Sequence, residues 1–207
     1  AVDSLNKTSL YESRTASSSS SSVLKVTAAT TAPAGNYNVQ VKQLATSSKV
    51  ALQSVTGGNT AKFNSGSLTI SAGSSSFDVD ITAANNTLAG MRDAINEAGK
   101  SSGVSATIIT DDSGSRLVLS STKSGGGNDI KVVASEDNVT TGANALTSQA
   151  FVPTVDPGNA DAFLKPNSTT GAGGVITKAQ SAKISIDGLE VVRNTNRIED
   201  ALEGVTL

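Results

Sequence analysis

Short runs in which apolar and polar residues alternate, each bounded by glycine- or serine-rich turns, constrain the fold of this chain most. Alternation with a period of two places every second side chain on the same face, which is typical of half-buried β-strands. Residues 68–81 are the most regular case. Their alternating apolar side chains, on either side of a turn at 73–76, are Leu68, Ile70, Ala72, Phe77, Val79 and Ile81. Two such runs joined by a short turn predict a β-hairpin.

The same alternation recurs along the chain and predicts further strands at residues 24–28, 37–41, 104–108, 117–119 and 130–132. Its phase changes between Val41 and Leu44, which predicts a bulge or the end of a strand. The pair Asp187-Gly188 joins two alternating runs, and such a pair favours a tight two-residue hairpin turn.

Two stretches lack this periodicity. The six consecutive serines at 17–22 compete for backbone hydrogen bonds and predict a mobile loop. Residues 135–180 are rich in turn-forming residues, so we expect long irregular connections there.

One segment, residues 86–99, has the pattern of an amphipathic helix. Leu88, Met91 and Ile95 recur at helical spacing and predict a face that is buried against neighbouring strands. The polar side chains that we expect to face away from the core are Arg92, Asp93, Asn96 and Glu97.

The ends of this helix carry suitable capping residues, since Asn86 or Thr87 can accept the first free amide and Gly99 stands where a left-handed C-terminal residue belongs. Residues 194–204 predict one or two further helical turns. Their expected cap, shared apolar face and terminating glycine are Asn196, Ile198, Leu202 and Gly204.

Composition excludes several kinds of site. The chain has no cysteine and no histidine, which excludes disulfides, Cys/His zinc sites and thiol or imidazole catalysis. Its 16 basic and 18 acidic residues give a net charge of −2, so we expect no nucleic-acid partner. No apolar run approaches the ~20 residues that span a bilayer, and we expect no membrane partner. The first residues contain neither a secretory signal nor an initiator Met, which predicts a fragment of a longer chain.

Two acidic pairs resemble catalytic carboxylates. Asp78 and Asp80 lie two apart on a predicted strand, about 6.5–7 Å from each other, which overlaps the spacing used by inverting glycosidases. They alternate with apolar residues, so we interpret them as the water-facing side of the strand. Asp93 and Glu97 form a like-charged pair on the predicted helix, which we interpret as part of its solvated face.

Other patterns are weaker still. Ser120 and Lys123 have the Ser-x-x-Lys spacing of serine β-lactamases but lack that family's companion motifs. Residues 111–115 resemble the start of a calcium loop, yet the twelfth position falls at Thr122 or Lys123 and not at a bidentate acid. Asn-x-Ser/Thr triplets carry little information in so Ser/Thr-rich a chain, and they begin at Asn6, Asn85, Asn138 and Asn167. We therefore predict no catalytic, cofactor-binding or metal-binding residue and no enzyme activity.

Three segments resemble flagellar proteins. Residues 87–132, TLAGMRDAINEAGKSSGVSATIITDDSGSRLVLSSTKSGGGNDIKV, resemble the flagellin hook IN motif through the helix LxxxRDAIN, the strand GVSA and the strand RLVLSS. Both GNYNVQVKQLATSS (35–48) and AKISIDGLEVVRNTNRIEDALEGVTL (182–207) resemble segments of the bacterial flagellar filament cap family, also called hook-associated protein 2. The resemblance covers about residues 20–133 and 180–207, and residues 135–180 resemble no segment that we can place.

This resemblance implies the head part of that family, without the leg helices. The expected fold class is mainly β with a few short helices (α+β), in two small β-rich domains, one inserted in the other. We expect an N-terminal segment at 1–22 that is partly flexible, and an outer domain formed by 23–56 plus 146–207. The inserted domain, at 57–145, is expected to contain the IN motif.

The resemblance also implies a structural assembly protein without cofactors. Such caps form a ring of four to six subunits at the distal tip of the extracellular bacterial flagellum, retain exported flagellin and promote its polymerisation. The implied partners are other copies of the chain, flagellin and the hook–filament junction proteins, the last two mostly through parts outside this chain. The residues of the oligomer interface are unknown from the sequence.

Two alternatives remain at this point. The IN motif also occurs in flagellin and other hook-associated proteins, so the chain is alternatively a head domain of one of these. The Ser/Thr/Gly-rich strands are also compatible with a secreted adhesin or glycan-binding module.

Overall fold

The computed structural model describes residues 13–207, apart from the side chains of residues 159–162, and it divides the chain into two compact units. Unit 1 is formed by two segments, Ala1–Ala45 and Ser181–Leu207, and unit 2 by the segment between them, Thr46–Gln180. Most of the regular structure in both units is β-strand, which confirms the predicted fold class.

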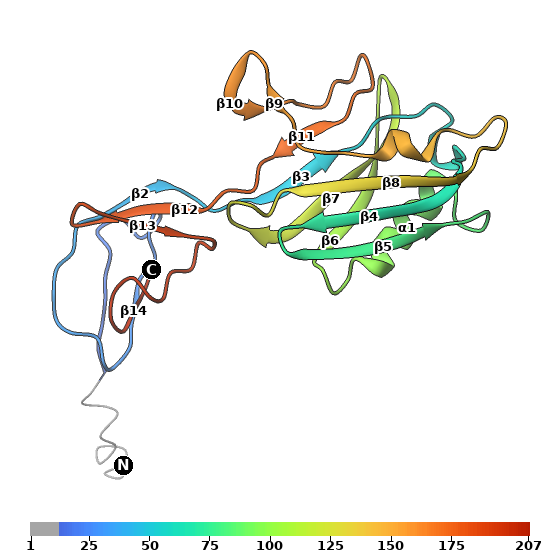
Figure 1. Cartoon of the computed structure of the whole chain (residues 1–207). Helices are drawn as coiled ribbons and strands as arrows, with labels where there is room; N and C mark the ends of the chain where they lie inside the picture. The colour runs from blue at the N-terminus through green and yellow to red at the C-terminus, as the bar shows by residue number, and fades with distance from the viewer. Residues whose placement is uncertain (1–12) are drawn as a thin grey trace, which may run out of the picture. The chain divides into compact units, whose positions relative to one another are not determined.

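The two larger sheets of unit 2 are both antiparallel. The four-stranded sheet has the order β11-β3-β7-β6, and its strands are β3 (Ser47–Ala51), β6 (Val104–Asp111), β7 (Gly114–Ser124) and β11 (Gly174–Thr177). The three-stranded sheet has the order β5-β4-β8, and Figure 1 shows these strands side by side. They are β4 (Ser65–Ala72), β5 (Ser75–Ile81) and β8 (Ile130–Asn138). The hairpin predicted around residues 68–81 is thereby confirmed as β4–β5, and the strands predicted at 104–108 and 117–119 lie in β6 and β7, which pair with each other.

The predicted helix is confirmed as α1 (Leu88–Ala98), which packs against β5 and β6 (Figure 1). Thr87 caps its first turn, since the Thr87 hydroxyl accepts a hydrogen bond from the Gly90 N–H at 3.0 Å. Leu88, Met91 and Ile95 are each 0% exposed, so the predicted apolar face is fully buried. Each of these side chains contributes about 1.5–3 kcal/mol of hydrophobic stabilisation, which fixes a helix this short.

Two details of the helix prediction are wrong. Gly99 has a right-handed backbone (φ −79°), and glycine is required there because a Cβ atom would lie 2.4 Å from the Val104 carbonyl oxygen. Asn96 does not face away from the core. Its side-chain amide accepts a hydrogen bond from the Ala106 N–H at 2.7 Å and donates one to the Ala106 carbonyl oxygen at 3.0 Å, so it joins α1 to β6.

The rest of unit 2 is shorter and less regular. It consists of η2 (Gly58–Thr60), η3 (Leu146–Gln149), and a hairpin of β9 (Val155–Asp156) with β10 (Asn159–Phe163). The irregular connections predicted for 135–180 are therefore interrupted by η3, by the β9–β10 hairpin and by β11. A single core joins both sheets and α1, and among its fully buried members are Phe63, Leu68, Ile70, Leu117 and Ile130.

The boundaries of unit 2 differ from those predicted for the inserted domain, 57–145. β3 lies before residue 57 but pairs with β7, and its Val50 is 0% exposed. β11 lies after residue 145 and pairs with β3. These pairings join segments far apart in the chain and leave no local pattern, which is why the sequence placed both segments in the outer domain of 23–56 plus 146–207.

We expect a fragment of residues 46–180 to fold cooperatively by itself, whereas a fragment of residues 57–145 should not. The shorter fragment lacks β3 and β11, so it exposes the edge of β7 and the core residues that β3 covers. Urea unfolding followed by far-UV circular dichroism measures the difference. A cooperative transition in the shorter fragment, equal to that of the longer one, would contradict the observed boundary.

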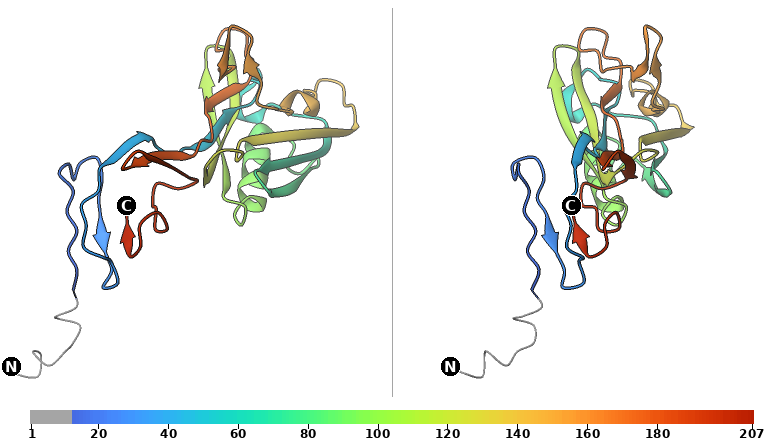
Figure 2. Two further views of the ribbon diagram at one scale, coloured as in Figure 1. Left: turned by 60° about the vertical axis from the view of Figure 1, so that its left-hand side comes forward. Right: turned by 90° about the vertical axis from the view of Figure 1, so that its left-hand side faces the viewer.

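Unit 1 has a three-stranded sheet with the order β13-β12-β2, formed by β2 (Val39–Gln43), β12 (Ala182–Ile186) and β13 (Leu189–Arg193). β1 (Thr27–Ala28) and β14 (Val205–Thr206) form a separate short pair (Figure 2). The strand predicted at 24–28 is thus reduced to two residues. The core of the unit is small, with Ile184, Ile186 and Ile198 as its buried aliphatic cluster.

The turn and the bulge predicted in unit 1 are confirmed. Asp187 and Gly188 have positive φ angles of 49° and 88°, as a two-residue turn between antiparallel strands requires. The Asp187 side chain accepts a hydrogen bond from the Asn38 N–H at 2.8 Å, which ties the turn to the edge of β2. The phase change near Val41 is a bulge at Lys42, because Lys183 pairs with Gln43 but Ile184 pairs with Val41.

The helical turns predicted for residues 194–204 are absent. The Asn196 side chain bonds the backbone of Ala45 instead of capping a helix, accepting from its N–H at 2.7 Å and donating to its carbonyl oxygen at 2.9 Å. Ile198 and Leu207 exchange backbone hydrogen bonds at 3.0 and 2.9 Å. Ile198 and Leu202 still share one apolar cluster, so the pattern located the buried residues and missed the backbone pairing that overrides a helix.

Candidate functional site

The most extensive buried polar cluster in the described chain surrounds Arg116 of β7. The Arg116 side chain is 2% exposed, and its guanidinium donates to the carbonyl oxygens of Ala172 and Asn167 at 3.0 and 3.2 Å. The same group donates to the Ser113 hydroxyl at 2.8 Å and forms an ion pair with Asp111 at 2.8 Å. The cluster therefore fastens the β6–β7 turn to the irregular segment before β11.

Asp111 is held ionised by this arrangement. Its carboxylate accepts hydrogen bonds from the Ser113 hydroxyl at 2.6 Å and the Ser113 N–H at 3.0 Å. These bonds, together with the charge of Arg116, lower the pKa of Asp111 below its ordinary value. The Asp111 carboxylate neutralises the charge of the Arg116 guanidinium, and two main-chain carbonyls and a hydroxyl accept its remaining hydrogen bonds, so the cluster holds three segments of unit 2 together.

We expect the free energy of unfolding to fall when the pH drops through the titration range of Asp111. Because its pKa is lower in the folded state, the unfolded chain takes up the proton first as the pH falls. The stabilisation is therefore complete above the ordinary aspartate value of about 4 and is lost below it. Asp111→Asn should flatten this dependence, because it removes the group that titrates. Urea unfolding between about pH 3 and 7 measures this dependence, and parallel curves for the parent and Asp111→Asn would contradict the assignment.

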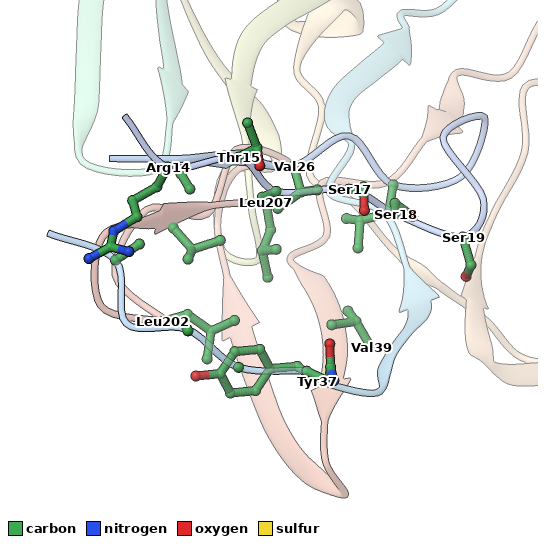
Figure 3. A pocket seen from close by; sticks show the side chains of 18 of the residues that line it. Arg14, Thr15, Ser17, Ser18, Ser19, Val26, Tyr37, Val39, Leu202 and Leu207 are labelled. Atoms are coloured by element: carbon green, nitrogen blue, oxygen red, sulfur yellow. The ribbon is translucent and has the colours of Figure 1, made fainter. Parts of the chain in front are cut away.

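Unit 1 contains a hollow with a volume of about 690 Å³ (Figure 3). Residues 13–20 line one side of it with polar side chains, while Val26, Val39, Leu202 and Leu207 contribute apolar surface. Arg14 is the one charged residue among the described residues that line it. The hollow therefore offers a contact surface of mixed polarity, with hydroxyl groups and one guanidinium on one side and aliphatic groups on the other.

The acidic pairs singled out in the sequence lie at the surface. Asp78 and Asp80 are exposed on β5, and Asp78 accepts a hydrogen bond from the Thr69 hydroxyl at 2.6 Å. The carboxylates of Asp93 and Glu97 are 67% and 76% exposed, and they pair with Arg92 at 2.7 Å and Lys100 at 2.6 Å respectively.

The Ser-x-x-Lys pair is not brought together. Residues three apart on a strand point to opposite faces, and Lys123 donates to the hydroxyl of Ser75 and not to Ser120. The first carboxylate of the calcium-like loop at 111–115, Asp111, forms an ion pair with Arg116. No group of three or more His, Cys, Asp or Glu that could hold a metal ion occurs among the described residues.

The Asn-x-Ser/Thr triplets differ in their surroundings. Asn85 accepts from the Thr82 N–H and donates to the Asp80 carbonyl oxygen, and Asn167 accepts from two backbone N–H groups that follow it. Asn138 is exposed at the end of β8. Asn6 lies outside the described residues.

Sequence reasoning missed Arg116 and the docking role of Asn96. The burial of Arg116 could have been predicted from residues 117–119, because three consecutive apolar residues are typical of a strand buried on both faces. An arginine directly before such a run must be buried with it, and a buried guanidinium needs partners.

In the described part of the chain, no helix is long and apolar enough to cross a bilayer, and α1 has only 11 residues.

Comparison with known proteins assigns the chain to a family. Residues 67–123 match the family model of the flagellin hook IN motif, and residues 1–48 match that of the flagellar hook-associated protein 2 N-terminus. The crystal structure of FliD (HAP2) from Pseudomonas aeruginosa PAO1 is 49% identical, with a TM-score of 0.77 over 88% of this chain and 76% of that chain. The chain belongs to the flagellar hook-associated protein 2 family.

Further relatives define how much of the family the chain represents. The B-type flagellar hook-associated protein 2 of Pseudomonas aeruginosa PAO1 is 49% identical over 208 residues, which cover 100% of this chain and 42% of that protein. The A-type protein of Pseudomonas aeruginosa is 34% identical, covering 98% and 41%. The chain thus spans less than half the length of these hook-associated proteins. The D2-D3 domains of the Serratia marcescens flagellar cap protein share 28% identity and a TM-score of 0.67, over 88% of this chain and 89% of that chain.

Membership in the hook-associated protein 2 family decides between the predictions. The relatives are hook-associated protein 2 chains, which favours the leading interpretation over a flagellin head domain. The family is one of structural flagellar proteins and not of enzymes, and it gives the chain a flagellar location. The matched IN motif is shifted from the predicted residues 87–132, since the match begins at residue 67, takes in most of the β4–β5 hairpin, and ends at residue 123.

Proposed function

We propose that this chain is the head region of a flagellar filament cap, which oligomerises at the distal tip of the filament, outside the cell. There it retains exported flagellin and promotes its polymerisation. The observation that carries the proposal is the match along the whole chain to hook-associated protein 2 of Pseudomonas aeruginosa, at 49% identity. The similarity to the D2-D3 domains of a flagellar cap protein adds structural support.

The proposal takes unit 2 as an inserted domain and unit 1 as part of the outer domain. Unit 1 is formed by two segments that flank unit 2 in the chain, and Val39 of the first pairs with Ile186 of the second. We take residues 13–22 as the described part of a partly flexible segment before the outer domain, and residues 1–12 of the predicted segment lie outside the described residues.

The proposed assembly is a ring of four to six copies. Subunits of a closed ring meet through two different surfaces, so a head domain in such a ring needs no active site but does need a rigid framework. The core of unit 2 and the Arg116 cluster provide such a framework. Flagellin and the hook–filament junction proteins would be met mostly by parts of the protein outside this chain.

The experiment uses a strain that lacks the full-length gene. We expect short or missing filaments, with monomeric flagellin released into the medium, as measured by electron microscopy of filaments and immunoblotting of culture supernatant. Full-length protein should restore filaments, and the same protein carrying the surface change Glu97→Ala should do so equally well. A full-length protein without residues 46–180 should fail to restore them. Normal filaments and no released flagellin in the deletion strain would overturn the proposal.

A further inference from the structure

Strand β6 forms one edge of the four-stranded sheet of unit 2, since β7 is its single partner strand among the described residues. A two-residue turn joins the strands, with Asp111 opposite Gly114. In such a ladder the residues that exchange hydrogen bonds with the partner alternate with residues whose N–H and C=O groups point outward. The outward-pointing residues of β6 are therefore Val104, Ala106, Ile108 and Thr110.

The sequence of this edge favours pairing with a strand of another molecule. Residues 104–110, VSATIIT, are mostly β-branched and contain no charge and no proline. Segments of this kind on an open edge favour pairing between molecules. Ile109 adds exposed apolar surface, at 43% exposure.

Helix α1 closes the first half of this edge. The Val104 N–H donates to the Gly99 carbonyl oxygen at 3.3 Å. One side chain then serves both groups of Ala106, because Asn96 accepts from its N–H at 2.7 Å and donates to its carbonyl oxygen at 3.0 Å. A carboxamide has one acceptor and a donor side by side, so Asn96 occupies the same hydrogen-bonding position that a residue of an added strand would take.

The second half of the edge stays open. In the part of the chain that the structure describes, no hydrogen bond is found for the outward-pointing backbone groups of Ile108 and Thr110. An edge with only two outward-pointing residues is shorter than a typical strand pairing. With Asn96 removed, the outward residues Ala106, Ile108 and Thr110 would together form a continuous open edge.

We propose that Asn96 seals the edge of β6 and thereby prevents this strand from pairing with β6 of a second copy of the chain. Anchoring α1 is a lesser role for this amide, because Leu88, Met91 and Ile95 already hold the helix with fully buried side chains. We take a second copy as the partner because two identical strands can pair antiparallel about a two-fold axis. The second strand then brings the same uncharged, β-branched sequence to the contact.

The test compares variants of the 207-residue chain at equal concentrations by size-exclusion chromatography with light scattering. We expect Asn96→Ala to form dimers and larger species beyond those of the parent. The Ala106 amide should exchange with deuterium about tenfold faster in the monomeric fraction, as the loss of one hydrogen bond predicts. The control Asn144→Ala removes a side-chain bond to the Lys62 carbonyl oxygen, away from this edge, and should behave as the parent does.

A rescue variant separates edge pairing from simple unfolding. Ile109→Lys places a charge on the exposed edge, so the double variant Asn96→Ala/Ile109→Lys should return to the parent's size distribution. If Asn96→Ala keeps the parent's size distribution, the proposal is wrong. It is equally wrong if the double variant still associates, or if the amides of α1 exchange as fast as that of Ala106, because the association would then come from a loosened helix.

Discussion

Met91→Asp should destroy the stability of unit 2. The Met91 side chain is 0% exposed and sits between Leu88 and Ile95 on the buried face of α1. An aspartate there must either bury a carboxylate among the hydrophobic side chains of this core or take up a proton. We expect a loss of at least about 4 kcal/mol, which places the variant among the most severe single substitutions.

Two controls make this result specific to the docking of α1. Met91→Leu conserves volume and apolar character and should cost less than about 1.5 kcal/mol. Glu97→Ala changes a carboxylate that is 76% exposed on the same helix and should be indistinguishable from the parent. Far-UV circular dichroism in urea is the suitable measurement, because the segment 46–180 contains no tyrosine or tryptophan whose fluorescence could report on unit 2. Equal shifts for Met91→Asp and Glu97→Ala would mean that α1 does not dock through this face.

Local signals in the sequence were sufficient to predict the hairpins and the helix. The β4–β5 and β12–β13 hairpins each have alternating residues on both sides of a short turn, so pattern and turn chemistry agree within some fifteen residues. The buried face of α1 follows from spacing alone. The buried residues at 198 and 202 were also found, although the helix assigned to them is absent.

Pairings between distant segments could not be predicted. β3 lies between β7 and β11, and these three strands come from segments that are separated by most of unit 2. No local pattern in residues 47–51 specifies either neighbour, which is why the predicted domain boundaries differ from those of unit 2. The same limit applies to Asn96 and Asn196, because each amide completes a backbone pair with a residue whose position depends on the folded structure.

The Arg116 cluster shows why a buried charge needs the complete fold around it. β7 supplies the guanidinium, the β6–β7 turn supplies Asp111 and Ser113, and the segment before β11 supplies two carbonyl oxygens. The arginine was visible in the sequence, but its partners lie up to 56 residues away. The cluster consequently forms only when the sheet and the irregular segment are both in place.

Arg116→Ala is the second substitution that should have a large effect. It leaves the Ala172 and Asn167 carbonyl oxygens without their donor and Asp111 without its cation. Removing one member of a buried ion pair typically costs about 3–5 kcal/mol, and we expect about 3 kcal/mol because Asp111 remains 27% exposed. Urea unfolding of the 207-residue chain measures this loss.

Arg116→Met and Arg92→Ala separate the possible causes of that loss. Methionine fills most of the space of the arginine stem but donates no hydrogen bond, so Arg116→Met should lose nearly as much stability as Arg116→Ala if the polar contacts carry the effect. Arg92→Ala removes an arginine that is 34% exposed and paired with its neighbour Asp93, and should leave stability nearly unchanged. If Arg116→Met is as stable as the parent, the cluster stabilises unit 2 through packing alone. The segment around residues 167–172 should then exchange its amides no faster in Arg116→Met than in the parent, whereas lost hydrogen bonds would release that segment first.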